Sequence, residues 1–263
     1  MTLFFYVFQA SLATATEVPE VLWTKDRSTT LSAGHKELGL FGPLRFGLEN
    51  DWEIRVQPVL IFLSPGVQAK KTISEKDKHS FGVDMGLTYP APLLNLLARE
   101  GTGGVLAPDI AIPKSPKLMS TARYTFEISK AHYLSLWQRV DLAPLAGSYD
   151  EESVLKSGQF PFTSIDAPLA YPRTAILRES IAIQTGVVLD GDIHKRWEYE
   201  VKTAMWVLPN LSENNWAFES HGIIRFLIKP DRALQTGMIY SLAEYPYGKQ
   251  WHILPTIDAR WYW

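Results

Sequence analysis

The chain has 263 residues, enough for one large domain with a sizeable buried core. Its formal net charge of −2 gives no electrostatic basis for a nucleic-acid partner. Cysteine is absent, which excludes disulfides, thiolate metal sites and cysteine nucleophiles. The sequence has no apolar run of about eighteen residues, so it predicts no transmembrane helix.

The first residues have the pattern of an export signal. An apolar stretch begins at Leu3 and is followed by "ATA" at residues 13–15, an A-x-A processing site. We therefore expect a secretory signal peptide over residues 1–15, although no Lys or Arg precedes the apolar stretch. A buried N-terminal strand is the alternative interpretation of this stretch.

Six later segments alternate apolar and polar residues, which predicts β-strands with two different faces. Only "APLLNLLARE" (91–100) resembles an amphipathic helix, and turn-like clusters divide the chain into about twelve strands. The expected fold is therefore all-β. In chain order the alternating segments are 52–62, 120–129, 133–142, 196–208, 216–229 and 251–263.

Two architectures suit such strands: a soluble sandwich or barrel with an apolar interior, and a membrane barrel with an apolar exterior. Most alternating runs are long enough to cross a bilayer at a tilt, which takes about 9–11 residues. Tryptophans at strand ends on the apolar face are typical of membrane-interface girdles. Both features favour the membrane barrel. The expected interface aromatics are Trp52, Trp197, Trp216, Trp251 and Trp261.

The lengths of the connections predict how the barrel is oriented. If the C-terminus is periplasmic, the short clusters "END", "SEKDKH", "SKAH", "DGDIHKR" and "KPDRA" all fall on the periplasmic side. The two long connections, 89–117 and 147–173, then fall on the outer side, as in outer-membrane barrels. An even strand count also places both termini in the periplasm.

The last strand, "WHILPTIDARWYW", carries the most specific signal. Trp261 and Trp263 match the aromatic positions of the C-terminal assembly signal of outer-membrane barrels, and Thr256 matches its polar position. Asp258 stands where that signal usually has glycine. On these residues the chain resembles bacterial outer-membrane β-barrel proteins, porin-like in the broad sense.

This resemblance implies a single antiparallel transmembrane barrel of about twelve strands in a Gram-negative outer membrane. Its partners would be outer-membrane lipid and, during biogenesis, the barrel-assembly machinery that reads the last strand. We expect residues 16–27 to be a periplasmic segment and residues 28–263 to form the barrel. The very short connections "FGP" and "LSPG" leave one side of the wall low, which suggests a homo-oligomer, such as a trimer, packed there.

Residues that could support catalysis form no complete set. "DIH" at 192–194 has the Asp-x-His spacing of omptin proteases, but its expected partner pair is missing and its turn is on the periplasmic side. Ser241, His221 and His252 could belong to a Ser–His lipase only with a supporting amide, and lumen polarity explains them equally. Histidines are too far apart for local metal-ligand spacing. We expect no enzymatic activity, no cofactor and no metal.

Polar positions opposite the apolar face are expected to line the lumen with charges of both signs. They allow two functions: a porin-like passive channel for small polar solutes or ions, or a structural barrel sealed by salt bridges that binds lipid or protein partners through its wall or loops. The expected lumen residues are Arg45, Glu53, Arg55, Arg123, Glu127, Arg139, Asp141, Arg178, Glu198, Glu200, Lys202, Glu219, His221, Arg225, Asp258 and Arg260.

Overall fold

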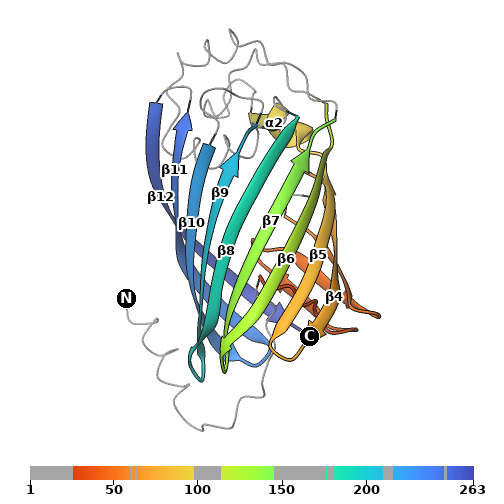
Figure 1. The fold of residues 1–263 in the computed structure, drawn as a ribbon, viewed down its shortest axis with the longest axis vertical. Coiled ribbons are helices and arrows are strands. Elements are labelled where there is room, and N and C mark those ends of the chain that lie inside the picture. The colour runs from red at the N-terminus through yellow and green to blue at the C-terminus, as the bar shows by residue number, and fades with distance from the viewer. Residues whose placement is uncertain are drawn as a thin grey trace, which may run out of the picture.

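The chain folds into a closed barrel of twelve strands, each antiparallel to both neighbours (Figure 1). The strands follow one another around the ring in chain order, and β1 closes the ring against β12. This confirms the predicted all-β single barrel. The computed structural model describes residues 26–59, 61–62, 64–97, 114–144, 176, 180–209, 216–245 and 248–263.

The strands differ in length around the ring. β1 to β3 have four or five residues, whereas β4 to β12 have 10 to 15. No helix among the described residues is long and apolar enough to cross a membrane. The elements are β1 (Lys36–Gly39), β2 (Leu44–Leu48), β3 (Trp52–Val56), β4 (Gly66–Lys76), β5 (His79–Thr88), α2 (Ala91–Leu97), β6 (Lys117–Ser129), β7 (His132–Leu142), β8 (Ile181–His194), β9 (Trp197–Val207), β10 (Trp216–Lys229), β11 (Arg232–Tyr245) and β12 (Gly248–Tyr262).

The two ends of the barrel carry connections of different length. At one end, called the turn end below, tight turns follow β2, β4, β6, β8 and β10, and the C-terminus lies there too (Figure 1). Asn50 and Asp77 in these turns have positive φ, which their short polar side chains tolerate. The opposite end, the loop end, carries α2 and the long connections between β5 and β6 and between β7 and β8.

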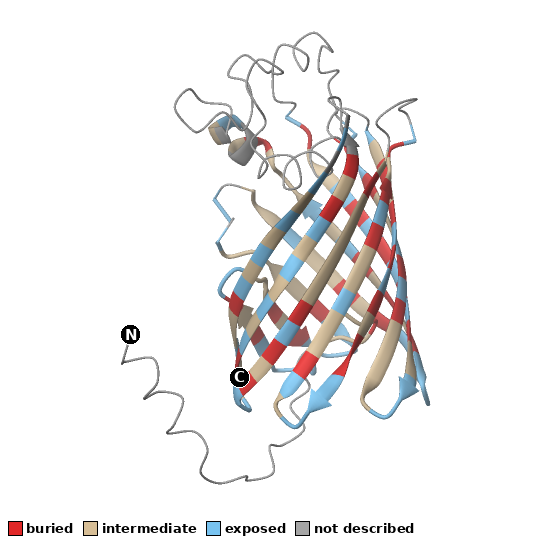
Figure 2. Ribbon diagram, turned by 90° about the vertical axis from the view of Figure 1, so that its left-hand side faces the viewer, coloured by how far each residue is buried: buried red, intermediate tan, exposed pale blue. Residues whose placement is uncertain are grey.

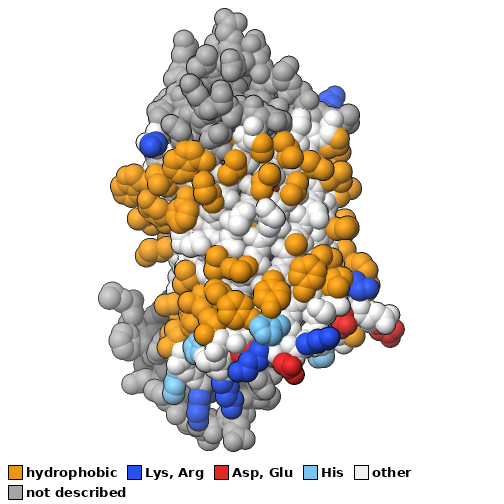
Figure 3. Space-filling model, viewed as in Figure 1, with side chains coloured by type: hydrophobic (Ala, Val, Ile, Leu, Met, Phe, Trp, Pro, Cys, Tyr) orange, Lys and Arg blue, Asp and Glu red, His pale blue; other side chains and the backbone are white. Residues whose placement is uncertain are grey.

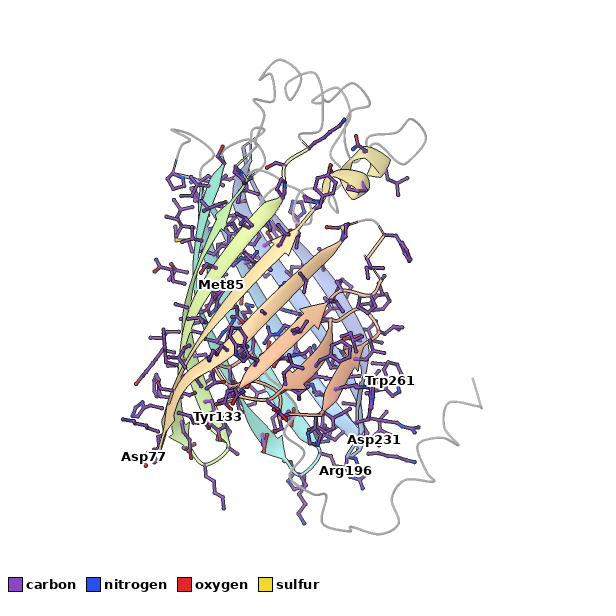
Figure 4. All side chains as sticks on the ribbon, turned by 90° about the vertical axis from the view of Figure 1, so that its right-hand side faces the viewer. Asp77, Met85, Tyr133, Arg196, Asp231 and Trp261 are labelled. Atoms are coloured by element: carbon purple, nitrogen blue, oxygen red, sulfur yellow. The ribbon has the colours of Figure 1, made fainter. Side chains whose placement is uncertain are left out.

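The wall is low over β1, β2 and β3, which Figure 4 shows in front of the longer strands. The alternation from Trp52 predicts a strand over residues 52–62, but β3 ends at Val56. The prediction was wrong beyond that point because Pro58 has no N–H to donate to a ladder. The barrel therefore has a short wall three strands wide.

Apolar side chains cover the outside of the barrel and charged ones lie inside. Figure 2 shows buried and exposed positions alternating along the strands, as a period of two requires. Hydrophobic side chains form two bands on the face seen in Figure 3. Trp52, Trp197 and Trp261 are outward residues near the turn end, and Trp216 and Trp251 are outward residues near the loop end. A soluble protein has apolar side chains inside and charged side chains outside. The opposite distribution found here is that of a transmembrane barrel.

Candidate functional site in the barrel lumen

The described lumen residues share the inward faces of their strands. Seven of those predicted are buried although charged, which in a membrane barrel means that they point away from lipid. Arg178 lies outside the described residues. Arg45, Glu53, Arg123, Asp141, Glu198, Arg225 and Asp258 are buried, and Arg55, Glu127, Arg139, Glu200, Lys202, Glu219, His221 and Arg260 are partly exposed on the same faces.

One group of ion pairs spans the short wall near the turn end. Glu53 is fully buried; it accepts from Arg45 Nε at 2.7 Å and also from Arg55. Arg260 donates to Glu37 at 2.7 Å and so links β12 to β1 across the closure of the ring. These carboxylates are each shared between cations, which is how buried charges avoid being left uncompensated.

A second set of polar contacts lies on β7 to β10, across the lumen from the short wall. Arg225 on β10 donates to Glu198 on β9 at 2.8 Å. Asp141 accepts from Arg139 at 2.6 Å and from the Gln184 amide at 3.0 Å. The lumen wall is therefore lined by paired charges of both signs rather than by one dominant sign.

Residues Asp26–Leu31, called the plug below, lie inside the turn-end half of the lumen. Asp26 forms ion pairs with Arg123 at 2.7 Å and Lys202 at 2.6 Å. Arg27 Nε donates to Asp190 at 2.9 Å. The last two residues of the expected periplasmic segment 16–27 are thus inside the barrel, and residues 16–25 lie outside the described part.

The plug backbone is also bound to the wall. Lys70 donates to the carbonyl oxygens of Arg27 and Thr29, both at 2.6 Å. The N–H groups of Ser28 and Leu31 donate to Thr125 at 2.9 Å and to Glu53 at 2.7 Å. Sequence reasoning missed this segment because "DRSTTL" shows no alternation and carries no strand or helix pattern.

An apolar patch occupies another part of the inner wall. Trp137, Val188, Ala204 and Trp206 are buried and form one cluster with two further alanines, Ala217 and Ala243. The Trp137 ring lies against Gly186 on the neighbouring strand, where a Cβ would come within 2.6 Å of it. Sequence reasoning assigned neither tryptophan to the lumen, although Trp137 alternates correctly with the inward Ser135 and Arg139.

Trp137 has a polar atom with no hydrogen-bond partner in the described part of the chain. Its indole Nε1 is buried, and it donates to no group among the described residues. The Lys202 ammonium lies 5.0 Å from the centroid of the same ring, in the range of a cation–π interaction. The patch therefore begins directly beside Lys202, one of the two cations that bind the plug.

The candidate catalytic residues are placed as follows. Ser241 on β11 is directly opposite His252 on β12, and both face the lumen. Glu219 on β10 is opposite Ser241 on its other side, so the carboxylate is two strands away from the imidazole that it would have to orient. Asp192 and His194 lie at the turn end of β8, where the register with β9 shifts.

The class defined by this fold and surface is the bacterial outer-membrane β-barrel: twelve antiparallel strands, an apolar exterior and an interior of paired charges. No protein-family model and no curated protein sequence matches the chain.

Three solved structures are similar to it at low sequence identity. The NanC porin is 10% identical with a TM-score of 0.47, and the match covers 87% of this chain and 96% of NanC. The outer-membrane channel DcaP of Acinetobacter baumannii is 6% identical with a TM-score of 0.41, covering 95% and 68%. A Pseudomonas aeruginosa FadL homologue is 9% identical with a TM-score of 0.40, covering 87% and 66%.

Proposed function

We propose that the protein is a channel for small polar solutes or ions in a Gram-negative outer membrane, and that the plug closes it in the conformation described. The turn end would face the periplasm. The observation that carries the proposal is the character of the plug's contacts: its side chains bind the wall through ion pairs, at Asp26 and Arg27. Water that enters the lumen can hydrate these charged groups, whereas it cannot replace the contacts of a packed apolar core.

The charge distribution supports passage of polar rather than apolar solutes at the turn end. When the plug leaves, Arg123, Lys202 and Asp190 lose their plug partners and would face water. Charges of both signs would then line the path, so we expect weak ion selectivity.

A sealed structural barrel is the second candidate. It is favoured by the wall's own ion pairs, Arg225–Glu198 and Arg260–Glu37, which do not involve the plug and remain when it leaves. Single-channel recording in planar bilayers separates the two candidates.

The test variant is Asp26→Asn combined with Arg27→Gln, which removes both charges and keeps polar side chains. We expect the wild type to be closed for most of the recording and the variant to be open for most of it. Arg232→Gln is the matched control, because its ion pair with Asp231 is exposed at a turn outside the lumen. If the folded plug variant stays as silent as the control, the ion pairs of Asp26 and Arg27 are not what keeps the lumen closed, and the proposed closure through these ion pairs is wrong.

A further inference from the structure

Two charged side chains of the plug are bound side by side on the wall formed by β6 to β9. The Asp26 carboxylate lies between Arg123 and Lys202, at 2.7 and 2.6 Å. The Arg27 guanidinium is bound by Asp190, with Nη2 at 2.5 Å and Nε at 2.9 Å from one carboxylate oxygen. The wall therefore holds a carboxylate next to a guanidinium, each bound by groups of the opposite charge.

The part of the wall that binds the guanidinium, called the cation subsite below, is built without the plug. Tyr133 on β7 and Asp190 on β8 are direct cross-strand partners, so the strand register fixes their relative position. The centroid of the Tyr133 ring, in the turn-end half of the barrel (Figure 4), lies 3.4 Å from the Arg27 guanidinium carbon. A carboxylate beside an aromatic face suits a planar guanidinium better than a compact ammonium group.

The cation subsite carries more negative charge than the plug neutralises. Glu200 on β9 is directly opposite Asp190 and also faces the lumen. It forms no ion pair within the described part of the chain. Two neighbouring carboxylates thus share this part of the wall, and the plug supplies a cation to one of them. A ligand with a second positive group would match the subsite better than the plug does.

The part of the wall that binds the carboxylate, the anion subsite, is also incompletely used by the plug. Arg123 binds Asp26 through Nη1, which donates to the side chain and to the backbone carbonyl oxygen. Its Nε is buried without a hydrogen-bond partner among the described residues, and its Nη2 lies 3.7 Å from Asp84. The plug therefore leaves the Nε side of this guanidinium without an acceptor, although arginine favours bidentate binding of a carboxylate.

The two subsites are close enough to bind one small molecule. Asp190 is opposite Glu200, and Lys202 is two residues further along β9 on the same face. Such diagonal neighbours on adjacent strands are about 7–8 Å apart. The side chain of one cationic amino acid can span this distance, and the plug spans it with two consecutive residues, Asp26 and Arg27.

We propose that these subsites bind a small zwitterion that carries a carboxylate and a guanidinium group, such as L-arginine. Its carboxylate takes the place of the Asp26 carboxylate, its guanidinium takes the place of Arg27, and its α-ammonium group lies toward Glu200. The plug is then a tethered competitor that the solute displaces. This inference rests on the proposed function, because the subsites open only when the plug leaves, and it names the solute class of the channel.

Displacement of the plug is measured by thiol labelling. Ser28→Cys places a thiol at a fully buried position of the plug, in a chain that has no cysteine of its own. The rate of reaction with a water-soluble maleimide is measured on folded full-length protein in detergent at constant ionic strength. Because L-arginine binds only barrels that the plug has left, it should raise this rate, by about threefold at a concentration of twice its Kd.

Two analogues of L-arginine test the two subsites separately. Agmatine lacks the carboxylate, and L-citrulline has an uncharged ureido group in place of the guanidinium. Each should need about tenfold more ligand for the same acceleration, equivalent to roughly 1.4 kcal/mol. Equal acceleration by L-citrulline, or by sodium chloride at the same concentration, would show that the plug is released without use of these subsites and would overturn the proposal.

A second measurement weakens the competition from the plug. Isothermal titration calorimetry of L-arginine with the Asp26→Asn, Arg27→Gln protein should show tighter binding than with the wild type. In this background Asp190→Asn should weaken binding about tenfold, again roughly 1.4 kcal/mol. Asp231→Asn is the matched control, because it makes the same change at an exposed turn outside the lumen. Equal binding by the Asp190→Asn and Asp231→Asn proteins, or no binding to the plug variant, would overturn the site.

Failure of this site and failure of the channel are distinguishable. A plug variant that conducts but does not bind L-arginine would retain the channel and overturn the site. A plug variant that binds L-arginine without conducting would retain the site and count against the channel. Folding of each variant is checked by the mobility shift between unheated and boiled samples on a gel.

Discussion

The carboxylate of Asp258 accepts a hydrogen bond from the backbone N–H of Phe41 at 2.9 Å. Arg260 also approaches this carboxylate at 3.5 Å. A Cβ on Gly39 would come within 2.7 Å of the same carboxylate, so the small residue makes room for it. Asp258 replaces the glycine expected in the C-terminal signal, and here it fixes the connection between β1 and β2.

We expect Asp258→Ala to lower the free energy of unfolding by about 1–3 kcal/mol, because the Phe41 N–H and the Arg260 guanidinium lose a charged acceptor. Asp258→Asn keeps an acceptor for Phe41 and should lose less. Urea unfolding followed by tryptophan fluorescence measures both. Equal losses in the two variants would show that the charge, rather than the bond to Phe41, is what matters.

Replacing Glu53 by Gln should destabilise the barrel strongly. Glu53 is fully buried and accepts from Arg45, Arg55 and the plug, so the change leaves buried cations uncompensated, at a cost of about 3–5 kcal/mol. Asp231→Asn removes an exposed ion pair and should cost less than about 1 kcal/mol. The same urea midpoints decide, and similar values for both variants would contradict the prediction.

Trp263 takes part in closing the ring. Its carbonyl accepts from Lys36 N–H at 2.7 Å, and its N–H donates to Lys36 at 3.0 Å. If the terminal aromatic is also an assembly signal, both deletion of Trp263 and Trp263→Ser should lower the amount of folded barrel in cells. Only the deletion removes the backbone bonds, so only it should lower the urea midpoint of the purified barrel. Normal levels of folded Trp263→Ser would show that the aromatic ring is incidental.

The proposed orientation is tested by cysteine labelling of intact cells. Lys114→Cys, on the loop-end side before β6, should react with a membrane-impermeant maleimide. Lys195→Cys, in the turn after β8, should react only after the outer membrane is broken. The reverse pattern would place the turn end outside.

Alternation predicted the strands because lipid and lumen impose opposite chemistry on successive residues. The tryptophans at 52, 197 and 251 could be placed at strand ends for the same reason. Trp137 and Trp206 were missed because an aromatic residue satisfies a lumen as well as a lipid interface, and only register tells them apart.

The plug could not be predicted from pattern, since it has neither strand nor helix. Its place depends on charges contributed by distant strands: Arg123 on β6, Lys202 on β9 and Asp190 on β8. A single sequence does not show that these meet Asp26 and Arg27. The early end of β3, in contrast, could have been predicted from the sequence. Pro58 lacks the N–H that a strand needs to donate to its neighbour.

Because β1 meets β12 only at the last residues of β12, the hydrogen bonds between described residues encircle the barrel completely only near the turn end. In mechanical terms the molecule is a tube slit along part of its length. A complete tube resists widening through its hoop of bonds, whereas a slit tube can widen by bending its wall. Changes in diameter are therefore easier at the loop end than at the turn end, where the plug is held.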